Sequence, residues 1–169
     1  MSKLSRLETA EDLEQAFEEW NVQIFRYVYA RVGKQEVAED LTQETFLKAW
    51  KKRTLFNPEK SALRTWFFTI AINTMRDYFR GEKHRKTVEL EDSIVDETDI
   101  EGEHSSKEGV ELVFDFVRQL PQRDQELLTL RYVDGLIIRE IGDILKMEYN
   151  ATKVAIHRAV KKQIGRAHV

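Results

Sequence analysis

The last third of the chain carries the pattern that most constrains its fold. From Leu120 to Lys162 it reads LPQRDQELLTLRYVDGLIIREIGDILKMEYNATKVAIHRAVKK. This predicts a short helix opening at Pro121, a turn at Asp134–Gly135, a short apolar helix and a basic last helix that starts near Asn150. That order is typical of a helix-turn-helix, whose last helix enters the major groove of DNA.

Three longer helices are expected before it, over residues 10–31, 35–53 and 62–80, the last ending at Gly81. Their apolar residues recur at helical spacing: Leu13, Phe17, Trp20, Ile24 and Val28 in the first, Val37, Leu41, Phe46, Ala49 and Trp50 in the second, and Leu63, Trp66, Phe67, Ile70, Ala71, Thr74 and Tyr78 in the third. Because only two prolines and seven glycines interrupt 169 residues, an all-α fold is favoured.

Charge divides the chain into two small helical modules and an acidic connection. Eleven acidic residues and a single base lie between Thr87 and Asp115, and a stretch so acidic and so poor in aromatic residues is typical of a flexible linker. We therefore expect a first module at residues 8–86, a linker at 87–107 and a second module at 108–169. The net charge of −3 conceals basic modules on either side of an acidic linker.

Composition argues against several other classes of protein. The chain has no cysteine, which removes disulfides and thiolate metal sites, and no apolar run approaches the roughly 18 residues of a membrane span. Glu101 and His104 have the spacing of a metal-binding pair but lack a matching partner motif. We expect a cytoplasmic protein without membrane insertion, catalytic residues, metal or cofactor, and hence not an enzyme.

Two separated segments resemble one family. AEDLTQETFLKAW (38–50) with RTWFFTIAINTMRDYFR (64–80), and the helix-turn-helix segment with KVAIHRA (153–159), are similar to group IV, or extracytoplasmic-function (ECF), sigma factors of bacterial RNA polymerase. The resemblance implies that the first module is sigma region 2, which docks on core polymerase and melts the −10 element. The second would be region 4, which binds the −35 element. Core polymerase, promoter DNA and an anti-sigma factor are the implied partners.

The polymerase-docking segment of that family matches Asp40, Leu41, Gln43 and Glu44. Asp40, Gln43 and Glu44 are spaced to share one helical face, which suits a partner rich in arginine. The alternative is a solvated helix face with no partner.

The −10 surface is expected on the third helix and the loop before it. Aromatic rings among cations suit single-stranded DNA, since rings stack on bases and cations follow phosphates. The resemblance places a base-reading residue at Asn73. The complete candidate set is Phe56, Asn57, Arg64, Trp66, Asn73, Arg76 and Arg80. For Trp66, helical spacing equally favours a core position.

The −35 set is Arg139, Lys153, His157, Arg158, Lys161 and Lys162, for which a solvated helix end is the alternative. The chain departs from the family at several positions near this surface: Gly142, Lys146, Glu148, Thr152 and Ala155. We expect Gly142, where the family usually has Ala, to cost up to ~1 kcal/mol, and Asn150 to cap the last helix.

Two other functions fit parts of the sequence. A dimeric helix-turn-helix regulator would bind duplex DNA tightly without polymerase. A helical enzyme that used the linker acids and histidines would bind metal. We expect instead a sigma factor that directs promoter-specific initiation.

Overall fold

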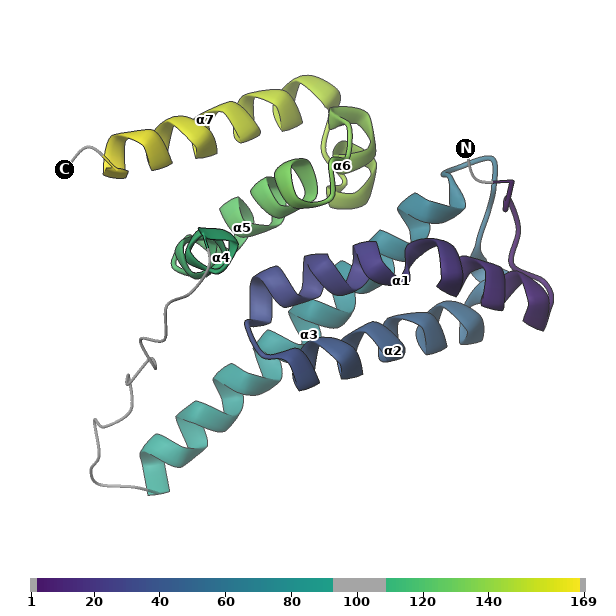
Figure 1. The fold of residues 1–169 in the computed structure, drawn as a ribbon, viewed down its shortest axis with the longest axis horizontal. Helices are drawn as coiled ribbons and strands as arrows, with labels where there is room; N and C mark the ends of the chain where they lie inside the picture. Colours follow the sequence, from purple (N-terminus) through teal and green to yellow (C-terminus); the bar gives the residue numbers. More distant parts are fainter. Residues whose placement is uncertain (1–2, 93–108, 168–169) are drawn as a thin grey trace.

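The computed structural model describes residues 3–92 and 109–167. This part of the chain is built of α-helices without a strand, as the sequence predicts (Figure 1). The first module holds α1 (Ala10–Val32), α2 (Gln35–Lys51), the 3₁₀ turn η1 (Arg53–Leu55) and α3 (Leu63–Asp92). The second holds α4 (Gly109–Arg118), α5 (Gln122–Leu128), the π-helical turn η2 (Thr129–Val133), α6 (Ile138–Leu145) and α7 (Tyr149–Ala167).

Helix α1 follows the expected boundaries because both of its ends are capped. Thr9 Oγ1 accepts a hydrogen bond from the Asp12 amide at 3.2 Å, and the Asp12 carboxylate accepts one from the Thr9 amide at 2.9 Å, which forms a capping box. Gly33 ends the helix with a φ of 71°, a left-handed conformation that favours glycine. The inner faces of α1, α2 and α3 bury an apolar core that includes Trp20, Phe46 and Phe67.

Helix α3 is longer than the sequence predicts. It passes through Gly81, where we expected it to end, and continues to Asp92. Arg85 pairs with Glu82 one turn away, and Thr87 Oγ1 donates to the Lys83 carbonyl at 3.0 Å. Such local bonds stabilise an exposed helix end, so residues 87–92 of the expected linker are helical. The rest of that linker, including Glu101 and His104, lies outside the described residues.

The second module has the expected order of helices. The turn between η2 and α6 contains Gly135 with a φ of 66°, and α7 lies along the outer side of the module (Figure 1). Thr152, Ile156 and Ala159 on the inner side of α7 are buried.

The two modules pack directly against each other. Helix α4 and η2 lie on α1, and α6 lies on α3. Leu127, Leu130 and Ile141 of the second module belong to the same buried apolar cluster as Tyr27 and Phe68 of the first. One hydrophobic core therefore crosses the boundary between the modules, which the sequence analysis did not predict.

Candidate nucleic-acid interface

The residues expected to dock on polymerase lie on α2, and three of the four are exposed. Asp40, Gln43 and Glu44 face solvent, whereas Leu41 is 6% exposed and packs in the core. Leu41 therefore holds the helix in place and offers no side chain to a partner. Lys48 lies 2.8 Å from Glu44 and partly neutralises that end of the acidic face.

The loop before α3 and the start of that helix form a small aromatic wall. The rings of Phe56 and Trp66 are half-buried, with centroids 5.4 Å apart. Trp66 also meets Phe67 edge-on at 5.9 Å, so it packs on the core and still presents one side to the surface. Asn57 is exposed, and its Oδ1 accepts a hydrogen bond from the Glu59 amide at 2.9 Å. These contacts fix the loop that would border a base-binding pocket.

Further along α3, the expected DNA-binding residues fall into two groups. Asn73 is exposed, and the Arg80 side chain is 77% exposed with Asp77 at 3.5 Å. Arg64 and Arg76, by contrast, are paired with acids of the second module. Of these four, Asn73 and Arg80 are therefore exposed, whereas Arg64 and Arg76 form ion pairs with the second module.

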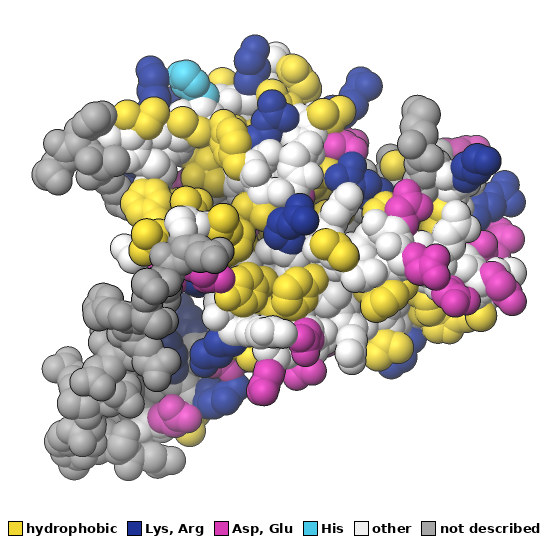
Figure 2. All heavy atoms as spheres, viewed as in Figure 1, with side chains coloured by type: hydrophobic (Ala, Val, Ile, Leu, Met, Phe, Trp, Pro, Cys, Tyr) yellow, Lys and Arg dark blue, Asp and Glu magenta, His cyan; other side chains and the backbone are white. Residues whose placement is uncertain are grey.

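The outer face of α7 carries the expected cations. Lys153, His157, Arg158 and Lys161 are all exposed, and Figure 2 shows basic side chains and a histidine along this edge. A groove of about 820 Å³ runs beside them between α7 and Arg131, Tyr132 and Ile138. Because buried Thr152, Ile156 and Ala159 hold the opposite side of α7, the cations are presented on a rigid element.

The remaining two −35 candidates lie at the edges of this surface. Arg139 is exposed in the first turn of α6. Lys162 lies 3.8 Å from Asp124 of α5, and its side chain is 52% exposed. Lys162 therefore pairs with an acid of its own module and still exposes about half of its side chain at the edge of the basic face.

The turn between α6 and α7 forms despite its unusual residues. Lys146 has a φ of 56° and a ψ of 50°, a left-handed conformation that glycine adopts at the least cost. The presence of glycine at position 142 has a steric explanation. A Cβ there would lie 2.8 Å from the Met147 carbonyl oxygen and 3.0 Å from Thr152 Oγ1. The prediction that Asn150 caps α7 was wrong. The helix begins at Tyr149, and the Glu148 carbonyl accepts hydrogen bonds from Thr152.

The sequence analysis missed a buried carboxylate at the contact between the modules. The Glu126 side chain of α5 is 2% exposed and lies 2.9 Å from Arg76 of α3, 3.9 Å from Arg31 of α1 and 3.4 Å from Arg123. Burial raises the pKa of Glu126, but the hydrogen bond and charge of Arg76, with help from Arg31 and Arg123, hold it below its usual value. Glu126 is consequently ionised at neutral pH.

The pKa of a second acid, Asp134, is shifted in the opposite direction, and both of its carboxylate oxygens are buried. Burial raises the pKa of Asp134 to about 8, although the charges of Arg26 and Arg64 oppose the shift. Neither of its carboxylate oxygens has a hydrogen-bond partner among the described residues. Asp134 is therefore mainly protonated at neutral pH.

The described residues carry neither a metal-binding cluster nor a membrane-spanning helix. They contain no group of three His, Cys, Asp or Glu side chains placed to hold a metal ion. None of their helices has the length and apolar character needed to cross a bilayer.

Comparison with known families matches both modules. The model of Sigma-70 region 2 matches residues 16–85, and that of Sigma-70 region 4 matches residues 111–162. These segments lie within the first and second modules respectively.

Individual relatives agree with these matches. The ECF RNA polymerase sigma-E factor of Haemophilus influenzae is 31% identical over 131 residues, which cover 71% of this chain and 69% of the relative. The ECF RNA polymerase sigma factor BldN of Streptomyces coelicolor is 32% identical over 148 residues. Its alignment covers 86% of this chain but 56% of that relative's length.

Solved structures share the fold at low sequence identity. CnrH in complex with the cytosolic domain of CnrY gives a TM-score of 0.71 at 21% identity, over 95% of this chain and 90% of that one. The sigma factor RpoE in complex with the anti-sigma factor NepR, from Bartonella quintana, gives 0.70 at 21% identity, over 90% of this chain and 94% of that one. The chain belongs to the ECF family of RNA polymerase sigma factors, the subunits that direct promoter-specific initiation of transcription.

Proposed function

We propose that this sigma factor binds core polymerase through the exposed face of α2 and binds promoter DNA through α3 and α7. One observation carries the proposal. A single chain presents an acidic helix face on one module and a row of exposed cations on the last helix of a helix-turn-helix (Figure 2). These charges suit a basic protein partner and DNA phosphates, respectively.

On α2, Asp40, Gln43 and Glu44 supply the docking contacts. The carboxylates accept hydrogen bonds from basic side chains of the partner, which are stronger than neutral ones. Leu41 contributes indirectly by anchoring the helix in the core.

On the first module, the aromatic wall and α3 receive the melted strand. Phe56 and Trp66 provide ring surface for stacking, and the Asn73 amide can address a base edge. Arg64, Arg76 and Arg80 follow the phosphates, and Asn57 lines the loop.

On the second module, the α7 cations and Arg139 bind the −35 duplex. Lys153 and His157 face the base edges, whereas Arg158, Lys161 and Lys162 contact phosphates. Few phosphate contacts give weak, salt-sensitive binding. Attachment of both modules to one polymerase raises their effective concentration at the promoter.

The proposal assigns no catalytic step to this chain, which acts in the cytoplasm where polymerase is. It includes an anti-sigma partner, since a structural relative was solved with the anti-sigma factor NepR. The dimeric regulator is the less favoured alternative, because family membership predicts a polymerase subunit.

Co-purification with core polymerase tests the docking assignment. Asp40→Ala and Glu44→Ala should each weaken polymerase binding and reduce run-off transcription. Glu36→Ala, an exposed acid in the first turn of the same helix, is the matched control and should behave as wild type. The docking assignment is wrong if neither variant loses binding.

A further inference from the structure

A basic cleft lies where α1, α3 and α5 meet. Its volume is about 430 Å³, within the range of about 300–1,000 Å³ that is usual for small-molecule sites. The lining includes Arg31 of α1, Arg76, Arg80 and Lys83 of α3, and Gln122 of α5. Among the described residues, this lining carries four cations and no acid, so the cleft favours an anionic ligand.

Two of the arginines are held in place by a buried carboxylate. Glu126 accepts hydrogen bonds from Arg76 Nε and Nη2, at 2.9 and 3.0 Å, and lies 3.9 Å from Arg31 Nη1. Arg31 also donates to the Tyr27 hydroxyl at 3.1 Å. Because the Glu126 side chain is 2% exposed and does not line the cleft, it orients both guanidinium groups without facing a ligand.

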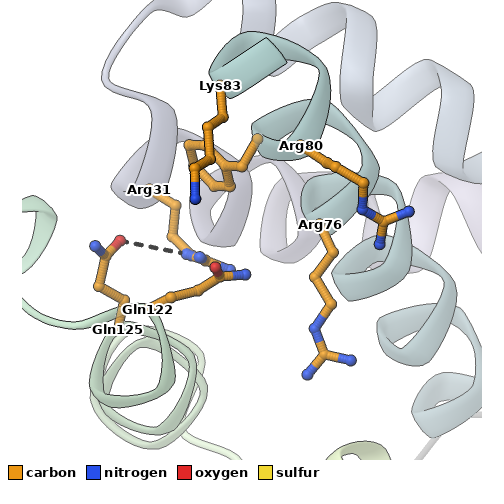
Figure 3. A pocket seen from close by; sticks show the side chains of 7 residues that line it. Arg31, Arg76, Arg80, Lys83, Gln122 and Gln125 are labelled. Carbon is orange, nitrogen blue, oxygen red and sulfur yellow. Dashed lines mark hydrogen bonds between the residues drawn. The ribbon is translucent and has the colours of Figure 1, made fainter. Parts of the chain in front are cut away.

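The cations of the cleft keep donors for an anion. A guanidinium has more N–H groups than the two that Arg76 uses on Glu126. Arg80 and Lys83 are exposed, with Asp77 3.5 Å from Arg80, and Figure 3 shows the Lys83 side chain pointing toward Arg31 (Figure 3). Cations that face one another across a cleft repel, and an anion bound between them removes this repulsion.

The apolar core that the two modules share fixes the walls of the cleft. Tyr27 of α1, Phe68 of α3 and Leu127 of α5 belong to one buried cluster. At the rim, Arg31 Nε donates to Gln125 at 3.5 Å. A ligand therefore meets a cleft whose shape is set before binding, which lowers the cost of ordering side chains around it.

We propose that this cleft binds the phosphate chain of a small molecule, either an inorganic oligophosphate or a nucleoside triphosphate. Phosphate oxygens accept charge-assisted hydrogen bonds from Arg76, Arg80 and Lys83. The inference goes beyond the proposed function, in which Arg76 and Arg80 contact DNA and the cleft has no ligand of its own.

The spacing of the cations favours several linked phosphates over one. Arg76, Arg80 and Lys83 are spread over about 10 Å of the helix axis, so a chain of phosphates reaches all three whereas a single phosphate does not. The exposed amide of Gln122 and the half-buried ring of Phe79 are available to the base of a nucleotide.

Isothermal titration calorimetry on the full chain, without polymerase or DNA, compares inorganic triphosphate, ATP and AMP. Triphosphate and ATP should both bind, and AMP should bind about tenfold more weakly because its one phosphate makes fewer charged contacts. Equal affinities for triphosphate and ATP would identify the phosphate chain alone as the ligand. Tighter binding of ATP would identify a nucleotide.

Removal of one cation tests the position of the ligand. Lys83→Gln should weaken triphosphate binding about tenfold, and Arg80→Gln should act in the same direction. Lys51→Gln, at an exposed lysine in the last turn of α2, lowers the net charge by the same amount and is the matched control. It should bind triphosphate as wild type does.

Chemical acetylation, read by mass spectrometry, locates the ligand in the unaltered chain. Saturating triphosphate should slow the acetylation of Lys83 and leave that of Lys51 unchanged. This readout needs no substitution, so it is independent of any folding defect in the variants.

Three results would overturn the proposal: no saturable binding of triphosphate or ATP, binding that Lys83→Gln leaves unchanged, or acetylation slowed equally at Lys83 and Lys51. If Lys83→Gln weakened the binding of single-stranded DNA but not of triphosphate, the cleft would belong to the DNA surface instead. None of these results affects the docking assignment on α2, since all of the measurements use the chain alone.

Discussion

Arg76 and Glu126 form a two-bond pair, with both nitrogen–oxygen distances between 2.9 and 3.0 Å, across the boundary of two modules that are each helical in themselves. The pair joins a half-exposed arginine of α3 to an almost fully buried carboxylate of α5. A double-mutant cycle with Arg76→Ala, Glu126→Ala and the double variant should give a coupling energy of about 1–3 kcal/mol in urea unfolding. Additive effects would mean that the pair contributes nothing specific.

Asp134 should make stability depend on pH. A carboxylic acid whose pKa is about 8 in the folded protein, against 3.8 ordinarily, holds its proton more tightly when folded. It therefore destabilises the fold increasingly as pH rises through that window, by at most about 1.4 kcal/mol per pH unit. Asp134→Asn removes this dependence, so its advantage over wild type should grow from pH 5 to pH 8.

Thermal unfolding of both proteins across this range checks the prediction. The buffers should have equal ionic strength, because Arg26 and Arg64 act on Asp134 through charge. Parallel stability curves for the two proteins would show that Asp134 is ionised normally.

Replacing Gly142 by alanine should destabilise the protein, although alanine has the higher helix propensity. A methyl group there meets the Met147 backbone oxygen at 2.8 Å, so Gly142→Ala should lower the free energy of unfolding by about 1–3 kcal/mol. Gly81→Ala is the control, since nothing lies within 4 Å of its added methyl group in α3. It should stabilise the protein by up to ~1 kcal/mol. Equal gains at both positions would contradict the steric reading.

Replacing Lys146 by glycine should increase the stability of the protein. A non-glycine residue at a φ of 56° bears a left-handed backbone cost of about 1 kcal/mol, which Lys146→Gly removes. Thermal unfolding should therefore show a higher midpoint. Asp143→Gly, in the body of α6, should give no such gain, and a midpoint unchanged in Lys146→Gly would argue against strain.

The fold could be predicted from the sequence where its signals are local. The apolar spacing in residues 10–31 and the Asp134–Gly135 turn placed α1 and the helix-turn-helix correctly. Gly81 misled the prediction of the third helix's end, because bonds made by Arg85 and Thr87 continue α3. Asn150 likewise misled the prediction of where the last helix starts. Helix α7 already begins at Tyr149, and the Glu148 carbonyl accepts the hydrogen bonds from Thr152.

Packing between the modules could not be predicted in this way. Glu126 stands next to Leu127 and Leu128, and nothing in that order distinguishes a buried acid from an exposed one. Its partners Arg31 and Arg76 lie far away in the sequence, and only the folded chain brings them together. For the same reason the sequence assigned Arg64 and Arg76 to DNA without showing that Glu140 and Glu126 contact them.

The most direct test of the account is transcription of genomic fragments by core polymerase, with and without this chain, followed by sequencing of the transcript 5′ ends. The account predicts discrete start sites that share two upstream elements when the chain is present, and their loss with Asp40→Ala. Start sites that match those of core polymerase alone would contradict it.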